Sequence, residues 1–206
     1  MIKGVIFDAF GTIVRISKGV HPYRRIIKIG IEQGRRPGKD DLQRIMTGHV
    51  GLQEAARLFG IQVPQEQMLE IEYALEQELA SIEAYEDGLK AVEMLQRAGF
   101  QVAVCSNLAE PYGPAVERLY PTLNAYGFSY EVGAAKPERA IYVATADQMS
   151  LDLDQCLMIG DSQLRDRDAP SLLGLKGHYL SRDGKGDFGD LASFARHILA
   201  TQDSDL

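Results

Sequence analysis

Residues 1–12 are MIKGVIFDAFGT, and this stretch decides the fold. Within it, Ile2–Phe7 is a short apolar run with β-branched residues, which is typical of a buried strand. A carboxylate, Asp8, follows the run directly, and Gly11 allows a tight turn soon after it. The stretch therefore predicts a buried strand that places one acidic side chain at the edge of a sheet.

Other short apolar runs are separated by longer stretches with helical periodicity. We predict further strands at Phe100–Cys105, Cys156–Ile159 and Leu175–Leu180, and a weaker strand near Phe128–Val132. We expect helices between them: one capped by Asp87 and ended by Gly99, one opened by Pro137, and a last one over about Leu191–Leu199. Strands that alternate with helices predict an α/β fold in which a parallel sheet is covered by helices on both faces.

The segment from Val14 to Ala84 departs from this alternation, because it contains no convincing strand. Apolar residues recur there at three- and four-residue steps, as in an amphipathic helix: Met68, Ile71, Leu75, Leu79 and Ile82. Shorter helices are expected at Tyr23–Gln33 and Leu52–Phe59, with a turn at Gly34–Gly38. An all-helical block after the first strand indicates an inserted cap over the sheet. We therefore predict a core of residues 1–13 and 85–206 and a cap of residues 14–84.

The composition is that of a globular protein. The 206 residues are 45% hydrophobic and 25% charged, which supplies enough apolar material for a buried core. No apolar run approaches the roughly 20 residues that cross a bilayer, and the first residues lack the cleavage site of a signal peptide. Cys105 and Cys156 both lie in apolar runs and are expected to be buried thiols. These features predict a cytoplasmic protein without a membrane partner.

Charge is unevenly distributed along the chain. The net charge of −7 argues against general nucleic-acid binding. Between Arg15 and Arg44, nine basic and three acidic residues give +6, which leaves −13 on the rest of the chain. A positive segment of this kind can attract a small anionic molecule, although a solvated helix face has the same composition.

Polar side chains follow the predicted strands where each strand ends. They are Asp8 after the first strand, Ser106 and Asn107 after the second, Lys136 before a helix, and Asp161 and Asp166 after Ile159. In an open parallel sheet the carboxyl ends of the strands meet at one edge, where ligands bind. Three carboxylates gathered there would repel one another by about 4 kcal/mol per pair at an effective dielectric of 20. Lys136 supplies one compensating charge, and a divalent cation held by oxygen ligands would supply two more.

These residues resemble the four motifs of the haloacid dehalogenase-like hydrolase superfamily. The motifs are Asp8-Ala9-Phe10-Gly11-Thr12, Ser106-Asn107, Lys136-Pro137, and Gly160-Asp161-Ser162 with Asp166, and they occur in order at similar spacing. The resemblance covers nearly the whole chain and implies a Rossmann-like core with a helical cap inserted after the first motif. It implies that Asp8 is the nucleophile, that Ser106 and Lys136 act with it, and that Ser106, Asn107 and Lys136 bind substrate. The implied ligands of a Mg²⁺ cofactor are Asp8, the backbone carbonyl of Phe10, Asp161 and Asp166.

The first motif departs from the pattern of the superfamily's phosphatases. Those enzymes usually carry a second aspartate two positions after the nucleophile, where it acts as general acid and base, and Phe10 occupies that position here. Dehalogenases of the superfamily have an aromatic residue there and hydrolyse 2-halo acids without metal, but they usually lack the acid that corresponds to Asp161.

The resemblance therefore implies a hydrolase, and we favour a Mg²⁺-dependent phosphatase acting on a small phosphorylated metabolite. Two alternatives stay open: a metal-independent 2-haloacid dehalogenase, and a catalytically weak binding or regulatory protein that retains the fold. The partner expected in the first two cases is a small anionic substrate, either a phosphate ester or a halo acid.

Overall fold

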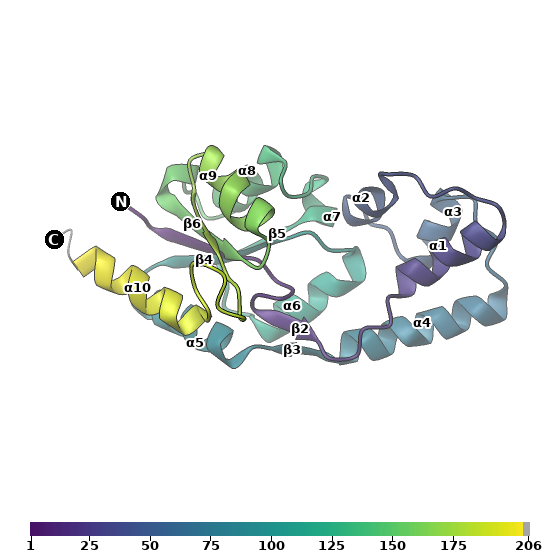
Figure 1. The fold of residues 1–206 in the computed structure, drawn as a ribbon, viewed down its shortest axis with the longest axis horizontal. Coiled ribbons are helices and arrows are strands. Elements are labelled where there is room, and N and C mark those ends of the chain that lie inside the picture. The colour runs from purple at the N-terminus through teal and green to yellow at the C-terminus, as the bar shows by residue number, and fades with distance from the viewer. Residues whose placement is uncertain (204–206) are drawn as a thin grey trace.

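Five parallel strands form the central sheet of the computed structural model, which describes residues 1–203 (Figure 1). In sheet order they are β5 (Ala125–Phe128), β4 (Gln101–Ser106), β1 (Gly4–Phe7), β6 (Cys156–Gly160) and β7 (Lys176–Tyr179). Strand β1 pairs in parallel with β4 on one side and with β6 on the other. The carboxyl end of β1 therefore lies between those of β4 and β6, where the winding of the sheet reverses and ligands commonly bind.

Helices cover both faces of this sheet (Figure 1). One face carries α5 (Glu86–Arg97), α6 (Gly113–Leu119) and α10 (Leu191–Asp203), and the other carries α8 (Arg139–Gln148) and α9 (Ala169–Leu172). Side chains alternate along β1, so that Val5 and Phe7 pack into the first apolar layer and Ile6 packs into the second. The predicted α/β fold with helices on both faces is thus confirmed.

The weak strand expected near Phe128–Val132 is displaced toward the amino terminus. Strand β5 ends at Phe128, and the next residues form the short helix α7 (Ser129–Val132). The strand gives a weak signal in the sequence because it contains Gly127, where a Cβ atom would overlap the side chain of Thr145 in α8. A glycine required by tertiary packing thus obscured the apolar pattern.

Helix boundaries differ from the expected ones at three places. Asp87 lies inside the first turn of α5 and does not cap it; its carboxylate instead accepts hydrogen bonds from Arg182 and from the backbone of Leu191. Helix α8 begins two residues after Pro137, and the last helix continues to Asp203. The Asp87 contacts join segments that are distant in the chain, so local capping rules do not reveal them.

The segment after β1 contains two short strands as well as helices. Strands β2 (Val14–Ile16) and β3 (Ile82–Ala84) pair antiparallel as a two-stranded ribbon, so the expectation of a segment without strands is wrong at both of its ends. Three residues are too few to establish a strand period. Four helices lie between the two strands: α1 (Pro22–Glu32), α2 (Asp41–Met46), α3 (Leu52–Leu58) and α4 (Gln65–Ala80). The six-residue helix α2 was not predicted.

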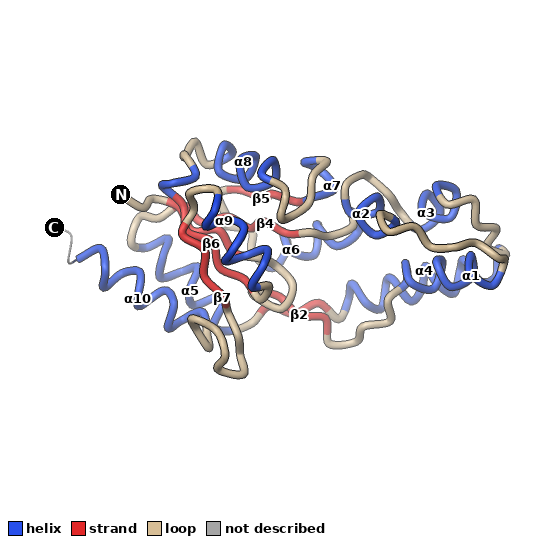
Figure 2. The backbone as a smooth tube through the Cα atoms, turned by 45° about the horizontal axis from the view of Figure 1, so that its top comes forward, coloured by secondary structure: helices blue, strands red, loops and turns tan. Residues whose placement is uncertain are grey.

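These four helices enclose an apolar cluster of their own, which includes Tyr23, Ile26 and Leu52. The same cluster includes Ala109, from the segment after β4, so the inserted helices pack directly against the sheet unit. Figures 1 and 2 show the inserted helices at the opposite end of the molecule from α10. The ribbon formed by β2 and β3 connects the two parts (Figure 1).

The remaining helical turns are η1 (Glu110–Tyr112), η2 (Leu153–Gln155) and the π-helical turn η3 (Gln163–Asp168). Both cysteines, Cys105 and Cys156, are buried and free, as expected. Within the part of the chain that the structure describes, no helix has the length and apolar character needed to span a bilayer.

Candidate active site

Asp8 lies at the centre of the carboxyl edge of the sheet. Its backbone N–H donates to the carbonyl of Ile159 at 2.9 Å, which continues the pairing of β1 with β6 beyond Phe7. Its side chain is 12% exposed, and its Oδ1 atom accepts hydrogen bonds from Ser106 Oγ and Lys136 Nζ, both at 2.9 Å. The ends of β1 and β4 thus bring the predicted nucleophile and the predicted hydroxyl together.

Lys136 is the buried cation of the site. Its Nζ atom contacts Asp166 Oδ1 at 2.6 Å as well as Asp8. Burial alone would lower the pKa of Lys136, but the negative charges of Asp8 and Asp166 raise it above its ordinary value. The lysine is therefore charged at neutral pH and holds two carboxylates that would otherwise repel each other.

Asn107 orients the backbone of Lys136. Its Oδ1 accepts from the Lys136 N–H at 2.7 Å, and its Nδ2 donates to the Lys136 carbonyl at 2.8 Å. Both ends of the amide are therefore engaged within the protein. The substrate contact expected for Asn107 stays a prediction, and the observed role of the side chain is to position the lysine.

Three carboxylates meet at this edge, from Asp8, Asp161 and Asp166. Each offers an oxygen that lies within 4.8 Å of the oxygens of the other two. Asp166 is fully buried in η3, and its Oδ2 accepts from the N–H of Ser162 at 2.9 Å. Burial raises the pKa of Asp166, against the attraction of Lys136.

The carboxyl group of Asp161 lies at the solvent side of the cluster. Although the residue is exposed as a whole, partial burial of the carboxyl group, followed by the negative charges of Asp8 and Asp166, raises its pKa to about 6. With Lys136 as the cation, the three carboxylates leave a formal charge of −2. A hard divalent cation such as Mg²⁺ fits this donor set in charge and in ligand chemistry.

Two glycines permit the close approach of the carboxylates. A Cβ atom at Gly11, where φ is 81°, would overlap Oδ2 of Asp161. A Cβ atom at Gly160 would overlap the carboxylate of Asp166 and approach Asp8. The cluster therefore depends on the absence of a side chain at both positions.

Phe10 packs against the core of the sheet unit and contacts a tyrosine that is bonded to the inserted helices. Its ring meets that of Tyr112 edge to face, with centroids 5.9 Å apart and an interplanar angle of 89°. The Tyr112 hydroxyl donates to Oε1 of Glu78 in α4 at 2.6 Å. Glu78 is 2% exposed, and its other oxygen accepts from two backbone N–H groups of the segment between β2 and α1. Phe10 is thus linked to the insertion indirectly, through Tyr112.

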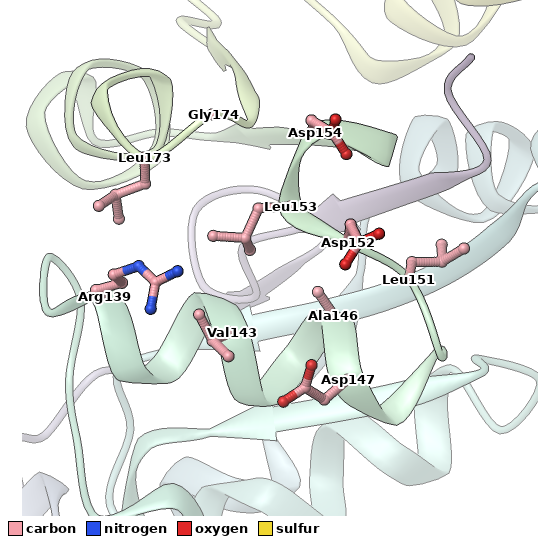
Figure 3. Close-up of a pocket in the computed structure, with 10 residues that line it drawn as sticks. All are labelled: Arg139, Val143, Ala146, Asp147, Leu151, Asp152, Leu153, Asp154, Leu173 and Gly174. Carbon is pink, nitrogen blue, oxygen red and sulfur yellow. The ribbon is translucent and has the colours of Figure 1, made fainter.

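A hollow lies elsewhere in the molecule. It has a volume of about 350 Å³ and is formed by α8, η2 and the turn after α9 (Figure 3). Arg139, Asp147 and Asp152 lie on its rim, and Leu153 points into it (Figure 3). None of the predicted site residues lines this hollow, so it is separate from the carboxylate cluster.

The geometry of the carboxyl edge agrees with a comparison of the whole chain with known families. A family model for haloacid dehalogenase-like hydrolases matches residues 2–171, a range that contains all four motifs. The chain belongs to the haloacid dehalogenase-like hydrolase family. No curated protein matches it significantly.

Solved structures of haloacid dehalogenase-like proteins share the fold. A HAD phosphatase from Thermococcus onnurineus is 20% identical with a TM-score of 0.61, and the match covers 96% of this chain and 98% of that one. A HAD family enzyme from Bacteroides thetaiotaomicron, in complex with magnesium and inorganic phosphate, is 17% identical with a TM-score of 0.62, covering 88% and 95%. An L-2-haloacid dehalogenase is 17% identical with a TM-score of 0.63, covering 97% and 100%. A phosphatase and a dehalogenase thus resemble this chain to a similar degree, and the fold alone does not choose between them.

Sequence reasoning missed several residues of this haloacid dehalogenase-like site. Thr12 is fully buried, and its Oγ1 accepts from the N–H of Asp161 at 3.1 Å. Tyr112 and Glu78 support Phe10, and Arg182 contacts the Thr12 carbonyl at 2.9 Å. Only Thr12 lies within a motif; the other three are separated from the residues they contact by long stretches of chain and leave no local signal.

Proposed function

We propose that the protein is a Mg²⁺-dependent phosphatase that acts on a small phosphorylated metabolite. The observation that carries the proposal is the group formed by Asp8, Asp161 and Asp166, whose charge Lys136 balances only in part. Carboxylates brought this close are costly unless a cation lies among them. A metal-independent reaction gives no reason to retain Asp161 in such a position.

Asp8 is assigned as the nucleophile. The hydrogen bonds from Ser106 and Lys136 go to its Oδ1 atom, which leaves Oδ2 to attack. Attack on phosphorus forms an aspartyl phosphate and expels the oxygen of the substrate alcohol, and water then cleaves this bond to release phosphate and regenerate Asp8. Such an intermediate divides one difficult displacement into two easier ones.

The other residues of the cluster stabilise charge on the transferred group. The Lys136 ammonium and the Ser106 hydroxyl both lie against Asp8, so they are placed to contact a phosphoryl group attached to it. Asp8, Asp161, Asp166 and the carbonyl of Phe10 would hold Mg²⁺, which supplies further positive charge to the phosphoryl oxygens. Asn107 contributes by fixing the backbone of Lys136.

Phe10 limits the substrates that such an enzyme can use. A general acid at this position would protonate the leaving oxygen, and proton transfer of this kind contributes about 10²–10⁴-fold to rate. Because Phe10 has no proton to give, substrates with good leaving groups, such as aryl or acyl phosphates, should react faster than alkyl phosphates. We therefore expect slow turnover of simple sugar phosphates.

Phe10 also favours a second candidate function, hydrolysis of 2-halo acids. Asp8 would then attack the carbon that bears the halogen and displace halide, which leaves without a proton. The aromatic pair of Phe10 and Tyr112 provides an apolar surface two residues from the nucleophile. This reaction needs no metal, and it is kept second because it gives Asp161 no role.

We assign residues 14–84 as a cap domain and residues 1–13 with 85–206 as the core. The insertion leaves the core directly after the Asp8 motif and returns at β3, immediately before α5. Polar contacts support its placement over the site: Gln43 donates to Glu138 at 2.9 Å, and His49 lies 3.1 Å from Glu110. A cap in this place would exclude water from the aspartyl intermediate and select the substrate.

A substrate panel separates the two reactions. Aryl phosphates, acyl phosphates and 2-halo acids are incubated with the protein in Mg²⁺ and, separately, in chelator, with Asp8→Asn as the matched inactive control. Phosphate release that requires Mg²⁺ and Asp8 would support the proposal. Halide release that persists in chelator would replace it with dehalogenation, and Mg²⁺ or phosphate binding without turnover of any compound would indicate a binding protein.

A further inference from the structure

Arg182 belongs to no motif, yet it is joined to the loop that carries the nucleophile. It follows β7, and its Nη2 donates to the carbonyl of Thr12 at 2.9 Å. The same guanidinium contacts both carboxylate oxygens of Asp87, at 2.9 and 3.2 Å, and lies 3.9 Å from the centre of the Tyr85 ring. Its direction is therefore fixed by a two-point ion pair and a stacking contact.

Thr12 connects Arg182 to the loop that carries Asp161. Its carbonyl is held by Arg182, and its hydroxyl accepts the N–H of Asp161 at 3.1 Å. The preceding residue, Gly11, lies so close to the Asp161 carboxylate that even a Cβ atom would overlap it. A displacement of residues 11 and 12 therefore moves the surroundings of Asp161 on two sides at once.

Asp87 ties the same group to the rest of the core. One of its oxygens also accepts from the N–H of Leu191 at 2.9 Å, at the start of α10. The side chains of Arg182 and Asp87 are 32% and 20% exposed, so the pair is shielded more than an ordinary surface ion pair. Arg182 thus connects the loop after Asp8 with the start of α5 and, through Asp87, with the start of α10.

We propose that Arg182 is a positioning residue for the metal site, which acts by fixing Thr12 and thereby the Asp161 carboxylate. The part of this proposal that concerns Mg²⁺ rests on the proposed function. The part that concerns the Thr12–Asp161 contact can be measured in the metal-free protein. Lysine is a poor replacement, because one ammonium group cannot reproduce the two-point contact with Asp87 together with the bond to Thr12.

The chain offers a matched control in Arg15. Arg15 lies over the same Tyr85 ring, at 5.6 Å from its centre, and pairs with Glu83 at 3.0 Å. It makes no contact with Thr12 among the hydrogen bonds of the described residues. Arg15→Met and Arg182→Met therefore remove the same charge near the same ring, and only the second removes the bond to Thr12.

The first measurement is hydrogen exchange of the Asp161 amide in chelator, followed by NMR. We expect exchange about tenfold faster in Arg182→Met, the factor that corresponds to one lost hydrogen bond to a charged group. The Arg15→Met variant should match the unmodified protein. Equal protection in both variants would overturn the proposal, whatever the reaction of the enzyme.

The second measurement is the dissociation constant of Mg²⁺ by titration calorimetry. We expect Arg182→Met to weaken binding about tenfold and Arg15→Met to change it less than twofold. If the unmodified protein binds no Mg²⁺, the proposed function fails, and the exchange measurement still decides the role of Arg182. If Arg182→Met melts too low for either measurement, Arg182→Lys replaces it, and its Asp161 amide must exchange faster than that of Arg15→Met for the proposal to stand.

Discussion

The contribution of Asp161 to the stability of the metal-free protein should fall as the pH rises from about 4 to about 6. Partial burial of its carboxyl group, together with the charges of Asp8 and Asp166, raises its pKa from 3.8 to about 6. Between these two values the folded state holds a proton that the unfolded state has lost. Stability that depends on this proton is fully present below pH 3.8 and is lost as the pH rises through 6.

The size of the effect follows from the difference between the two pKa values. A rise from 3.8 to about 6 corresponds to about 3 kcal/mol at 1.36 kcal/mol per pH unit. Because the residue is substantially exposed, solvent screens much of this energy, and we expect about 1 kcal/mol to remain. Saturating Mg²⁺ should reverse the trend, since the metal binds the ionised carboxylate.

Urea denaturation in chelator, at four pH values from 4 to 7.5, measures this effect. Other groups titrate in the same range, so the informative quantity is the difference in unfolding free energy between Asp161→Asn and the unmodified protein. This difference should grow by about 1 kcal/mol in favour of the variant across the range. Parallel curves for the two proteins would refute the argument that Asp161 is destabilised by its carboxylate neighbours.

Three other substitutions test the remaining parts of the site. Asp8→Asn should abolish turnover of any accepted substrate while leaving the fold intact, and a variant with more than a few per cent of the activity would exclude the covalent mechanism. Phe10→Asp should raise turnover of alkyl phosphates more than that of aryl phosphates in Mg²⁺, because it restores a proton donor; a stable variant without this gain would count against the phosphatase. Lys136→Met should lower the unfolding free energy in chelator by about 3–5 kcal/mol, since it leaves Asp8 and Asp166 buried without a cation. Urea denaturation measures this loss. A loss below about 1 kcal/mol would show that the lysine is not the main counter-charge.

The central strands of the sheet could be predicted from the sequence, because a strand that is buried on both faces has a continuous apolar run. Strands β1, β4 and β6 lie at the centre of the sheet, and their residues are almost all buried on both faces. Once these strands were recognised, parallel topology required Asp8, Ser106 and Asp161 to meet at one edge. The meeting of these side chains was predictable because it depends on strand order and strand ends more than on the details of packing.

The elements that escaped prediction are short or depend on tertiary contacts. The ribbon of β2 and β3 is held by pairing between residues far apart in the chain, such as Arg15 with Glu83, which are 68 positions apart. Strand β5 contains Gly127 because α8 approaches it closely, and that approach is invisible in the sequence. In both cases the cause lies in another segment of the chain, so a local pattern carries little of the information.

The same reasoning explains why the motif residues were found and their supports were not. Motif positions are defined by chemistry, because a nucleophile, a cation and metal ligands need particular side chains at strand ends. A supporting contact such as Arg182 to Thr12, 170 positions apart, uses a backbone carbonyl on one side. Every residue type except proline offers both backbone groups, so the partner leaves no trace in composition or spacing. The precision of the carboxylate cluster therefore depends on residues that only the three-dimensional arrangement identifies, and the contrast between Arg182→Met and Arg15→Met measures how much one of them contributes.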